Sequence, residues 1–268
     1  MAILLTDAQL ATMTDGYGMI ANGAVAIEGD RIVWRGPMAQ IPPTYAKLPR
    51  HSAQGRLVTP ALIDCHSHIV FGGDRAAEFE MRLNGASYEE VARAGGGILS
   101  TVTATRAASE DALLQQALAR ADQIIAGGAA TIEVKSGYGL TIADELKMLR
   151  VAREIGKKRS VRILTTHLAA HAIPPEYKGR SMEYIQTVAI PSLQAAHAEG
   201  LVDAVDAFCE GIAFSPAEVE ALFNAARALG LPVKLHAEQL SDLKGAALAA
   251  RFQALSADHL EYLAADGI

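Results

Sequence analysis

The chain has 268 residues, of which half are hydrophobic and 20% are charged, and its formal net charge is −6 at pH 7. This composition is typical of a globular protein with a substantial core. The basic residues are not clustered, so nucleic acid is not an expected partner. No run of about 20 apolar residues predicts a membrane span, and no signal-peptide pattern opens the sequence. With only two cysteines, these features predict a cytoplasmic protein without a disulfide framework.

Residues 1–56 predict a small β module. The stretch MAILLTDAQLATM is typical of a strand, and AVAIEGDRIVWRGP (Ala24–Pro37) alternates on both sides of EGDR. This alternation predicts a hairpin with Gly29 and Asp30 at its turn.

From residue 57 to 268, short apolar runs alternate with segments of helical periodicity. This alternation predicts parallel β/α units, and about six of them favour a (β/α) barrel, whose complete set is eight. A doubly wound sheet stays open on the pattern alone, although no glycine-rich nucleotide-binding motif follows a strand. The expected strands lie in LVTPALIDCHSH, ATIEVKSG, SVRILTTH, VDAVDAFCEG, LPVKLHAEQ and FQALSADHLE, and expected helices span Glu110–Gly128, Ile142–Lys158 and Ser215–Gly230.

Six of the eight histidines fall at or just beyond the ends of these strands, where a barrel builds its active site. Any one of them alone is better explained by a structural role. As a set they predict a metal site, because neutral imidazole is the commonest metal ligand. His66 and His68 form an H-x-H pair, His236 is the expected third ligand, and His259 is either a fourth ligand or an acid/base. The six are His66, His68, His167, His171, His236 and His259.

Four motifs follow one another along the chain: DCHSHIVFGGDRAAEFEMRLNGASYEEVARAGGGI, EVKSGYGL, THLAAHAIPPEY and KLHAEQLSD. In this order they resemble the imidazolonepropionase family of the amidohydrolase superfamily, and the resemblance runs from residue 20 to the end. It implies a (β/α)8 barrel of the amidohydrolase kind with a small β-sandwich, to which residues 1–56 contribute. It also implies one zinc or iron ion and hydrolysis of 4-imidazolone-5-propanoate to N-formimidoyl-L-glutamate, a step of histidine degradation.

The resemblance also implies roles for single residues. His66, His68 and His236 match the metal-binding histidines. Arg75 matches the residue that binds the substrate carboxylate, which suits the planar fork of a guanidinium. Tyr138, His171 and Gln239 match positions that contact the substrate. Taken alone, Arg75 would be interpreted as a surface residue and Tyr138 as a packing residue.

Proton transfer needs a group other than Gln239, because an amide cannot serve as a general acid. We expect His259 to be catalytic, and for Glu238 a catalytic and a structural role are equally favoured. Lys135 ends the second strand and is not expected to be a carbamylated, metal-bridging lysine, and His167 is expected to be structural.

Two alternatives remain open: a related enzyme that deaminates a heterocycle, and a catalytically incomplete fragment. The second arises because the family completes its metal site with an aspartate on an eighth strand, and only six strands are expected here. Asp258 and Asp266 lie in the sixth unit and are not expected to replace that aspartate. A homodimer is expected only by analogy.

Overall fold

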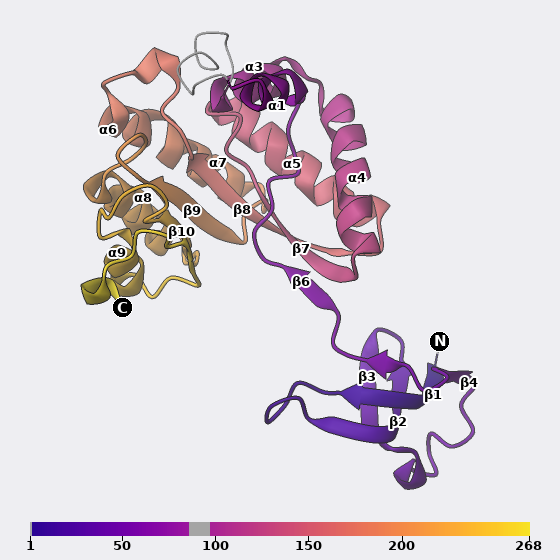
Figure 1. The fold of residues 1–268 in the computed structure, drawn as a ribbon. Helices are drawn as coiled ribbons and strands as arrows, with labels where there is room; N and C mark the ends of the chain where they lie inside the picture. The colour runs from indigo at the N-terminus through magenta and orange to yellow at the C-terminus, as the bar shows by residue number, and fades with distance from the viewer. Residues whose placement is uncertain (1, 86–96) are drawn as a thin grey trace. The chain divides into compact units, whose positions relative to one another are not determined.

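A computed structural model describes residues 2–85 and 97–268, so residues 86–96 of the first motif lie outside the described residues (Figure 1). The chain forms two compact units, Met1–Leu62 and Ile63–Ile268. The division falls at residues 62/63 and not at the expected 56/57. It shifts because the short strand β5 (Leu57–Val58) pairs with β1 (Ala2–Ala11) and so joins the N-terminal sheet.

The N-terminal unit is a mixed five-stranded sheet. β1 pairs antiparallel with β2 (Met19–Glu28), which pairs antiparallel with β3 (Arg31–Pro37), while β4 (Arg50–Ser52) and β5 run parallel to β1. The hairpin prediction is confirmed, and Gly29 takes a φ of 63° in the turn, which glycine tolerates. Small apolar clusters cover both faces of the sheet, one around Leu10 and Val25 and one around Leu4 and Ala26.

The second unit is built on a six-stranded parallel sheet with the order β11-β10-β9-β8-β7-β6. Each strand lies beside its neighbour in the sequence, as expected for successive β/α units. This confirms the predicted α/β fold class with six units. The strands are β6 (Leu62–Asp64), β7 (Ala129–Lys135), β8 (Arg162–Ala170), β9 (Ala204–Cys209), β10 (Leu235–Ala237) and β11 (Ala257–His259).

Helices cover one face of this sheet (Figure 1). A π-helical turn, Ile185–Ala189, joins α6 to α7. No helix in residues 2–85 or 97–268 is long and apolar enough to cross a bilayer. The helices are α1 (Ala76–Leu83), α3 (Ile98–Ala107), α4 (Glu110–Ala126), α5 (Ile142–Lys158), α6 (Ser181–Tyr184), α7 (Ile190–Ala198), α8 (Pro216–Ala228) and α9 (Gly245–Arg251).

The helix ends follow the local sequence. Ser215 and Glu218 form a capping box at the start of α8, and Gly230 follows its end with a φ of 71°, as the sequence predicts. The last turn of α5 carries Lys157 and Lys158, where cations oppose the negative end of the helix dipole. These signals fix where each helix starts and stops, and so which residues the loops carry over the sheet.

The core lies between the sheet and its helices. Apolar residues of β7–β10 pack against α4, α5, α7 and α8 in two clusters that include Ile132, Leu149, Phe214 and Phe223. Because alternate residues of a strand point to opposite faces, the other face of the sheet receives a second set of side chains. That set is polar, and it holds the candidate site.

Candidate active site

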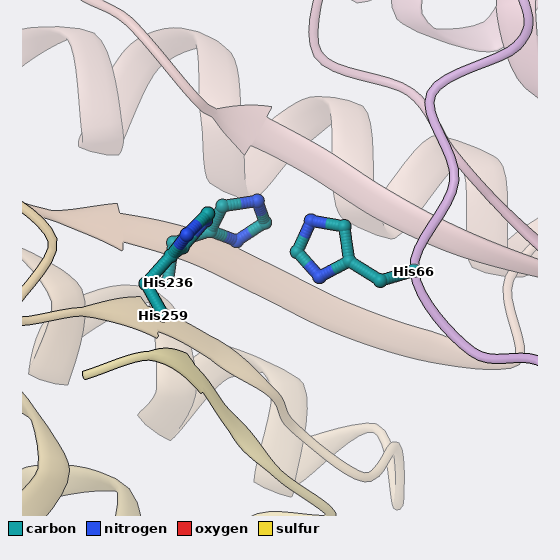
Figure 2. Close-up of side chains that lie close together, drawn as sticks. All are labelled: His66, His236 and His259. Atoms are coloured by element: carbon teal, nitrogen blue, oxygen red, sulfur yellow. The ribbon is translucent and has the colours of Figure 1, made fainter. Parts of the chain in front are cut away.

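Three histidines from three strands converge at one place (Figure 2). His66 follows β6, His236 lies in β10 and His259 ends β11. One ring nitrogen of each lies within 4.8 Å of one ring nitrogen of the other two. His236 is buried, His66 is half-buried and His259 is exposed. The fold thus brings together histidines that are up to 193 positions apart in the sequence, as the strand-end pattern predicted.

His68 lies beside this group. Its Nε2 is 3.2 Å from Nε2 of His66, and its ring centroid is 5.5 Å from that of His236. On its other side it stacks on His171, with 5.1 Å between the ring centroids. The predicted ligand set of His66, His68 and His236 is therefore brought together, while the tightest group of nitrogens includes His259 in place of His68.

The buried imidazoles favour their neutral form. Burial, reinforced by the neighbouring His171 and His236, holds the pKa of His68 well below its ordinary value. Burial and His236 likewise lower the pKa of His171 to about 4. Among the described residues, Nδ1 of His68 and both ring nitrogens of His236 are buried without a hydrogen-bond partner. Neutral imidazoles with such nitrogens are the donors that zinc and iron accept, so this set fits a metal ion.

A buried network of charges lies behind the histidines. Lys135 Nζ is 2.7 Å from Asp206 Oδ2 and 3.0 Å from Glu133 Oε1. Lys234 Nζ binds the other oxygen of Glu133 at 2.6 Å and the carbonyl oxygen of Cys65 at 2.7 Å. The strands alternate, so Glu133 and Lys135 share a face of β7, and Lys234 shares a face with His236.

Two carboxylates of this region reach the histidines. Asp258 Oδ2 lies 2.8 Å from Nδ1 of His66, and Asp206 Oδ2 lies 3.0 Å from Nδ1 of His236. The first pair is aligned for a hydrogen bond, whereas in the second the N–H direction misses the carboxylate. Burial alone would raise the pKa of Asp258, but the hydrogen bond with His66 and the charges of Lys234 and Lys135 lower it to about 2.

Two of the predicted substrate residues, Tyr138 and His171, lie beside His68. Tyr138 lies 6.0 Å from His68 and 5.3 Å from His171, measured between ring centroids. His171 has Nδ1 3.1 Å from the carbonyl oxygen of Gly137, which leaves Nε2 as an acceptor in the neutral ring. Arg75 precedes α1 and binds the buried carboxylate of Glu78, with Nε 2.8 Å from Oε2. Arg75 also lowers the pKa of Tyr138 against the larger, raising effect of burial.

Glu238 and Gln239 follow β10. Glu238 has a φ of 49°, so the chain leaves the strand geometry there and its side chain turns to α9. Its two carboxylate oxygens accept hydrogen bonds from the backbone N–H groups of Gly245 and Ala246, at 2.5 and 2.8 Å. This contact gives Glu238 a capping role at the start of α9, while the catalytic role remains a prediction. Gln239 is half-buried just beyond it.

His167 does not lie at a strand end, because β8 continues to Ala170. The expectation that six histidines end strands therefore fails for this one. His167 is fully buried on the helix side, with Nε2 2.8 Å from the hydroxyl of Ser192 in α7. Its structural role agrees with the prediction.

Lys135 is charged. Burial alone would lower the pKa of Lys135, but the carboxylates of Asp206 and Glu133 outweigh burial and raise it. A lysine must lose its proton before it can be carbamylated, so this environment disfavours that modification. The network around Lys135 was not predicted, although polar residues at alternate positions in TIEVKSG and VKLHAE are a visible signal for it.

A cavity of about 460 Å³ adjoins the network. Its lining comes largely from the amino ends of the strands, including Leu164, Asp203 and Leu255, and contains no histidine. The histidine cluster lies at the carboxyl ends, where barrel active sites form. The cavity reaches the histidine cluster only through the network, since its lining includes Glu133, Lys234 and Asp258.

No protein-family model matches the chain. In solved structures, it is similar to ochratoxinase from A. niger, with a TM-score of 0.65 at 16% identity over 99% of this chain and 62% of that one. A 5-methylcytosine deaminase from Klebsiella pneumoniae gives a TM-score of 0.62 at 16% identity, over 93% of this chain and 56% of that one. At these identities the likeness shows the fold alone, which is that of amidohydrolase-type hydrolases and deaminases.

Sequence relatives are much nearer. The chain is 64% identical over 266 residues to an imidazolonepropionase of Cereibacter sphaeroides, covering 99% of this chain and 67% of that protein. It is 63% identical over 268 residues to one of Paracoccus denitrificans, with 99% and 67% covered. The chain thus spans about two thirds of the length of these relatives. At this identity and coverage, the chain belongs to the imidazolonepropionase family.

Proposed function

We propose that the protein hydrolyses the cyclic amide bond of 4-imidazolone-5-propanoate to give N-formimidoyl-L-glutamate, a reaction of histidine degradation. The observation that carries this proposal is the convergence of His66, His68 and His236 in a chain that is 64% identical to an imidazolonepropionase. A cytoplasmic location and a homodimer remain predictions from the sequence.

His66, His68 and His236 would hold a single zinc or iron ion, with His259 beside His66 and His236. When bound, such an ion supplies Lewis acidity and lowers the pKa of water to about 7. One of the solved structures of the same fold, an atrazine chlorohydrolase from Arthrobacter aurescens, is complexed with zinc; its TM-score is 0.59 at 14% identity, over 93% of this chain and 55% of that one. The donor set itself does not distinguish zinc from iron, because imidazole suits both.

The remaining residues would bind and orient the substrate. Arg75 offers its guanidinium to the propanoate carboxylate, as a planar fork suits a carboxylate. Tyr138 keeps its proton, because burial raises its pKa, and can donate a hydrogen bond from its hydroxyl. Neutral His171 presents Nε2 as an acceptor, and the amide of Gln239 can both donate to and accept from the imidazolone ring.

Hydrolysis adds one water across the ring C–N bond: the water oxygen bonds to the carbonyl carbon, and the ring nitrogen leaves with a proton. We assign the proton transfer to His259. Partial burial of its side chain and the neighbouring His236 lower the pKa of His259, so that its ring is neutral at pH 7 and can accept a proton before passing it on. Glu238 is a weaker candidate, since both of its oxygens are occupied at α9.

The test is to follow the purified protein with 4-imidazolone-5-propanoate by its ultraviolet absorption and to identify the product by mass spectrometry. Formation of N-formimidoyl-L-glutamate supports the proposal. Ammonia released from cytosine or guanine derivatives, without turnover of the imidazolone, would replace it with the deaminase function.

A further inference from the structure

In the charge network behind the histidines, one lysine lies near both of the carboxylates that contact cluster histidines. Lys135 is completely buried, and its ammonium contacts Asp206 at 2.7 Å and lies 4.0 Å from Asp258, to which Lys234 is slightly nearer at 3.8 Å. Each of these carboxylates lies against Nδ1 of a different cluster histidine, Asp206 at His236 and Asp258 at His66. Lys135 is therefore the one charge that both carboxylate–histidine pairs share among the described residues.

The pairs leave the opposite nitrogen of each ring directed at the cluster. Nε2 of His66 faces Nε2 of His68 at 3.2 Å, and Nε2 of His236 is buried without a hydrogen-bond partner among the described residues. The hydrogen bond of His66 Nδ1 with Asp258 keeps the proton on Nδ1, and the lone pair of that ring then resides on Nε2. At His236 the N–H direction misses Asp206, but a negative carboxylate 3.0 Å from Nδ1 favours the same tautomer electrostatically. Such carboxylates orient histidine ligands in many metal sites.

We infer that Lys135 is a positioning residue, which holds Asp206 and Asp258 so that His236 and His66 present Nε2 to a metal ion. This inference rests on the proposed metal site. It assigns Lys135 no contact with substrate and no carbamate.

The surrounding contacts support a holding role. Asp206 also accepts a hydrogen bond from the backbone N–H of Ala207 at 2.7 Å, so its carboxylate is fixed from two directions. Glu133 in turn is shared between Lys135 and Lys234. Without the ammonium of Lys135, Asp206 would keep a buried charge with fewer partners, and such a charge is costly. Its carboxylate would then shift or take up a proton, and the ring of His236 would lose its restraint.

The first test needs no variant. Long-range nitrogen–proton NMR on the metal-free protein, at a pH of about 8 where histidine is ordinarily neutral, reports which ring nitrogen carries the proton. Protons on Nδ1 of both His66 and His236 support the inference. A proton on Nε2 of either ring would overturn it.

The second test measures cobalt(II) and zinc affinity of Lys135→Met, Lys135→Arg and Asp206→Asn. Lys135→Met should bind about 10–100-fold more weakly, as is typical when a residue behind a metal ligand is lost, and its cobalt absorption bands should shift. Lys135→Arg should recover part of the affinity. The exposed Lys157→Met, on the outer helix α5, is the matched control and should bind like the parent.

When Lys135→Met is combined with Asp206→Asn, it should weaken metal affinity less than it does in the parent, because Lys135 acts through Asp206. Unchanged affinity in Lys135→Met, with the parent binding one ion, would overturn the inference and leave the proposed function in place. A parent that binds no cobalt or zinc would remove both the metal site and this inference. If Lys135→Met does not fold, the inference can still be tested by the tautomer measurement and by the metal affinities of Lys135→Arg and Asp206→Asn.

Discussion

Nε2 of His66 and Nε2 of His68 lie 3.2 Å apart, and the two residues are separated by one position on the segment that follows β6. Two neutral imidazoles at this distance share at most one proton between the facing nitrogens, whereas a cation can bind both lone pairs at once. The arrangement is therefore better satisfied with a cation present.

Substitution of His66 should remove that cation. In His66→Ala we expect no stoichiometric zinc or iron by elemental mass spectrometry. We also expect no rise in the melting temperature of the variant on adding zinc. The parent should melt at a higher temperature with zinc, because free zinc at 100 times its Kd adds about 2.7 kcal/mol to the unfolding free energy. His197→Ala, on the exposed face of α7, is the control and should behave like the parent. Full metal occupancy in His66→Ala would sink the ligand assignment.

Arg75 should govern substrate affinity and leave metal binding intact. Arg75→Ala removes the guanidinium proposed to bind the carboxylate, so KM should rise roughly 10–100-fold, corresponding to the loss of a charge-assisted hydrogen-bonded pair of about 1.5–3 kcal/mol. Glu78 would keep Arg82 at 2.9 Å and the N–H of Gly97 at 2.8 Å as partners. Arg82→Ala, which removes a second cation from Glu78, is the matched control for a purely structural effect. An unchanged KM in Arg75→Ala, or an equal rise in the control, would argue against the assignment.

Much of this fold follows from local sequence patterns. The six strands, the hairpin at Gly29 and the capping of α8 by Ser215 could all be predicted, because each depends on residues close together in the chain. Strand ends also predicted that His66 and His236 would meet, since parallel strands carry their carboxyl ends to one edge.

The partners of these histidines could not be predicted in the same way. Which of Glu133, Asp206 and Asp258 contacts which histidine depends on the register of separate strands and on rotamers. The expectation that Asp258 does not replace the aspartate of an eighth strand stays a prediction, but the hydrogen bond of its carboxylate with Nδ1 of His66 was not foreseen. The contacts of Glu238 were equally unpredictable. In a regular strand its side chain would lie on the same face as that of His236, but its positive φ turns it away.

Glu238 should prove to be a stabilising cap and not a proton carrier. Glu238→Ala leaves the N–H groups of Gly245 and Ala246 without their carboxylate, and we expect a loss of about 1–3 kcal/mol in unfolding free energy. Glu238→Gln keeps one acceptor oxygen, so it should lose less stability and retain most of kcat. Urea denaturation and steady-state kinetics on the two variants separate the roles. A collapse of kcat in a stable Glu238→Gln would show that the carboxyl group transfers a proton.

His167 should make the protein sensitive to acid. Burial lowers its pKa to about 3, against about 6.5 in the unfolded chain. Between these values the unfolded chain binds a proton that the native protein does not, so stability falls as the pH falls from 6.5 toward 3. The expected slope is about 1.4 kcal/mol per pH unit, and below a pH of about 3 this loss stops because the native ring is protonated too.

The measurement is urea denaturation of the metal-free protein at several pH values. His167→Gln should be less stable at neutral pH, because it repacks the contact with Ser192, but its stability should fall less steeply with acid. The exposed His197→Gln should follow the parent curve. If His167→Gln shows the same slope as the parent between pH 6.5 and 4, the acid sensitivity resides in other groups. His171 and His68 are next in line, because their native pKa values are lowered too and both would be protonated in the unfolded chain over this pH range.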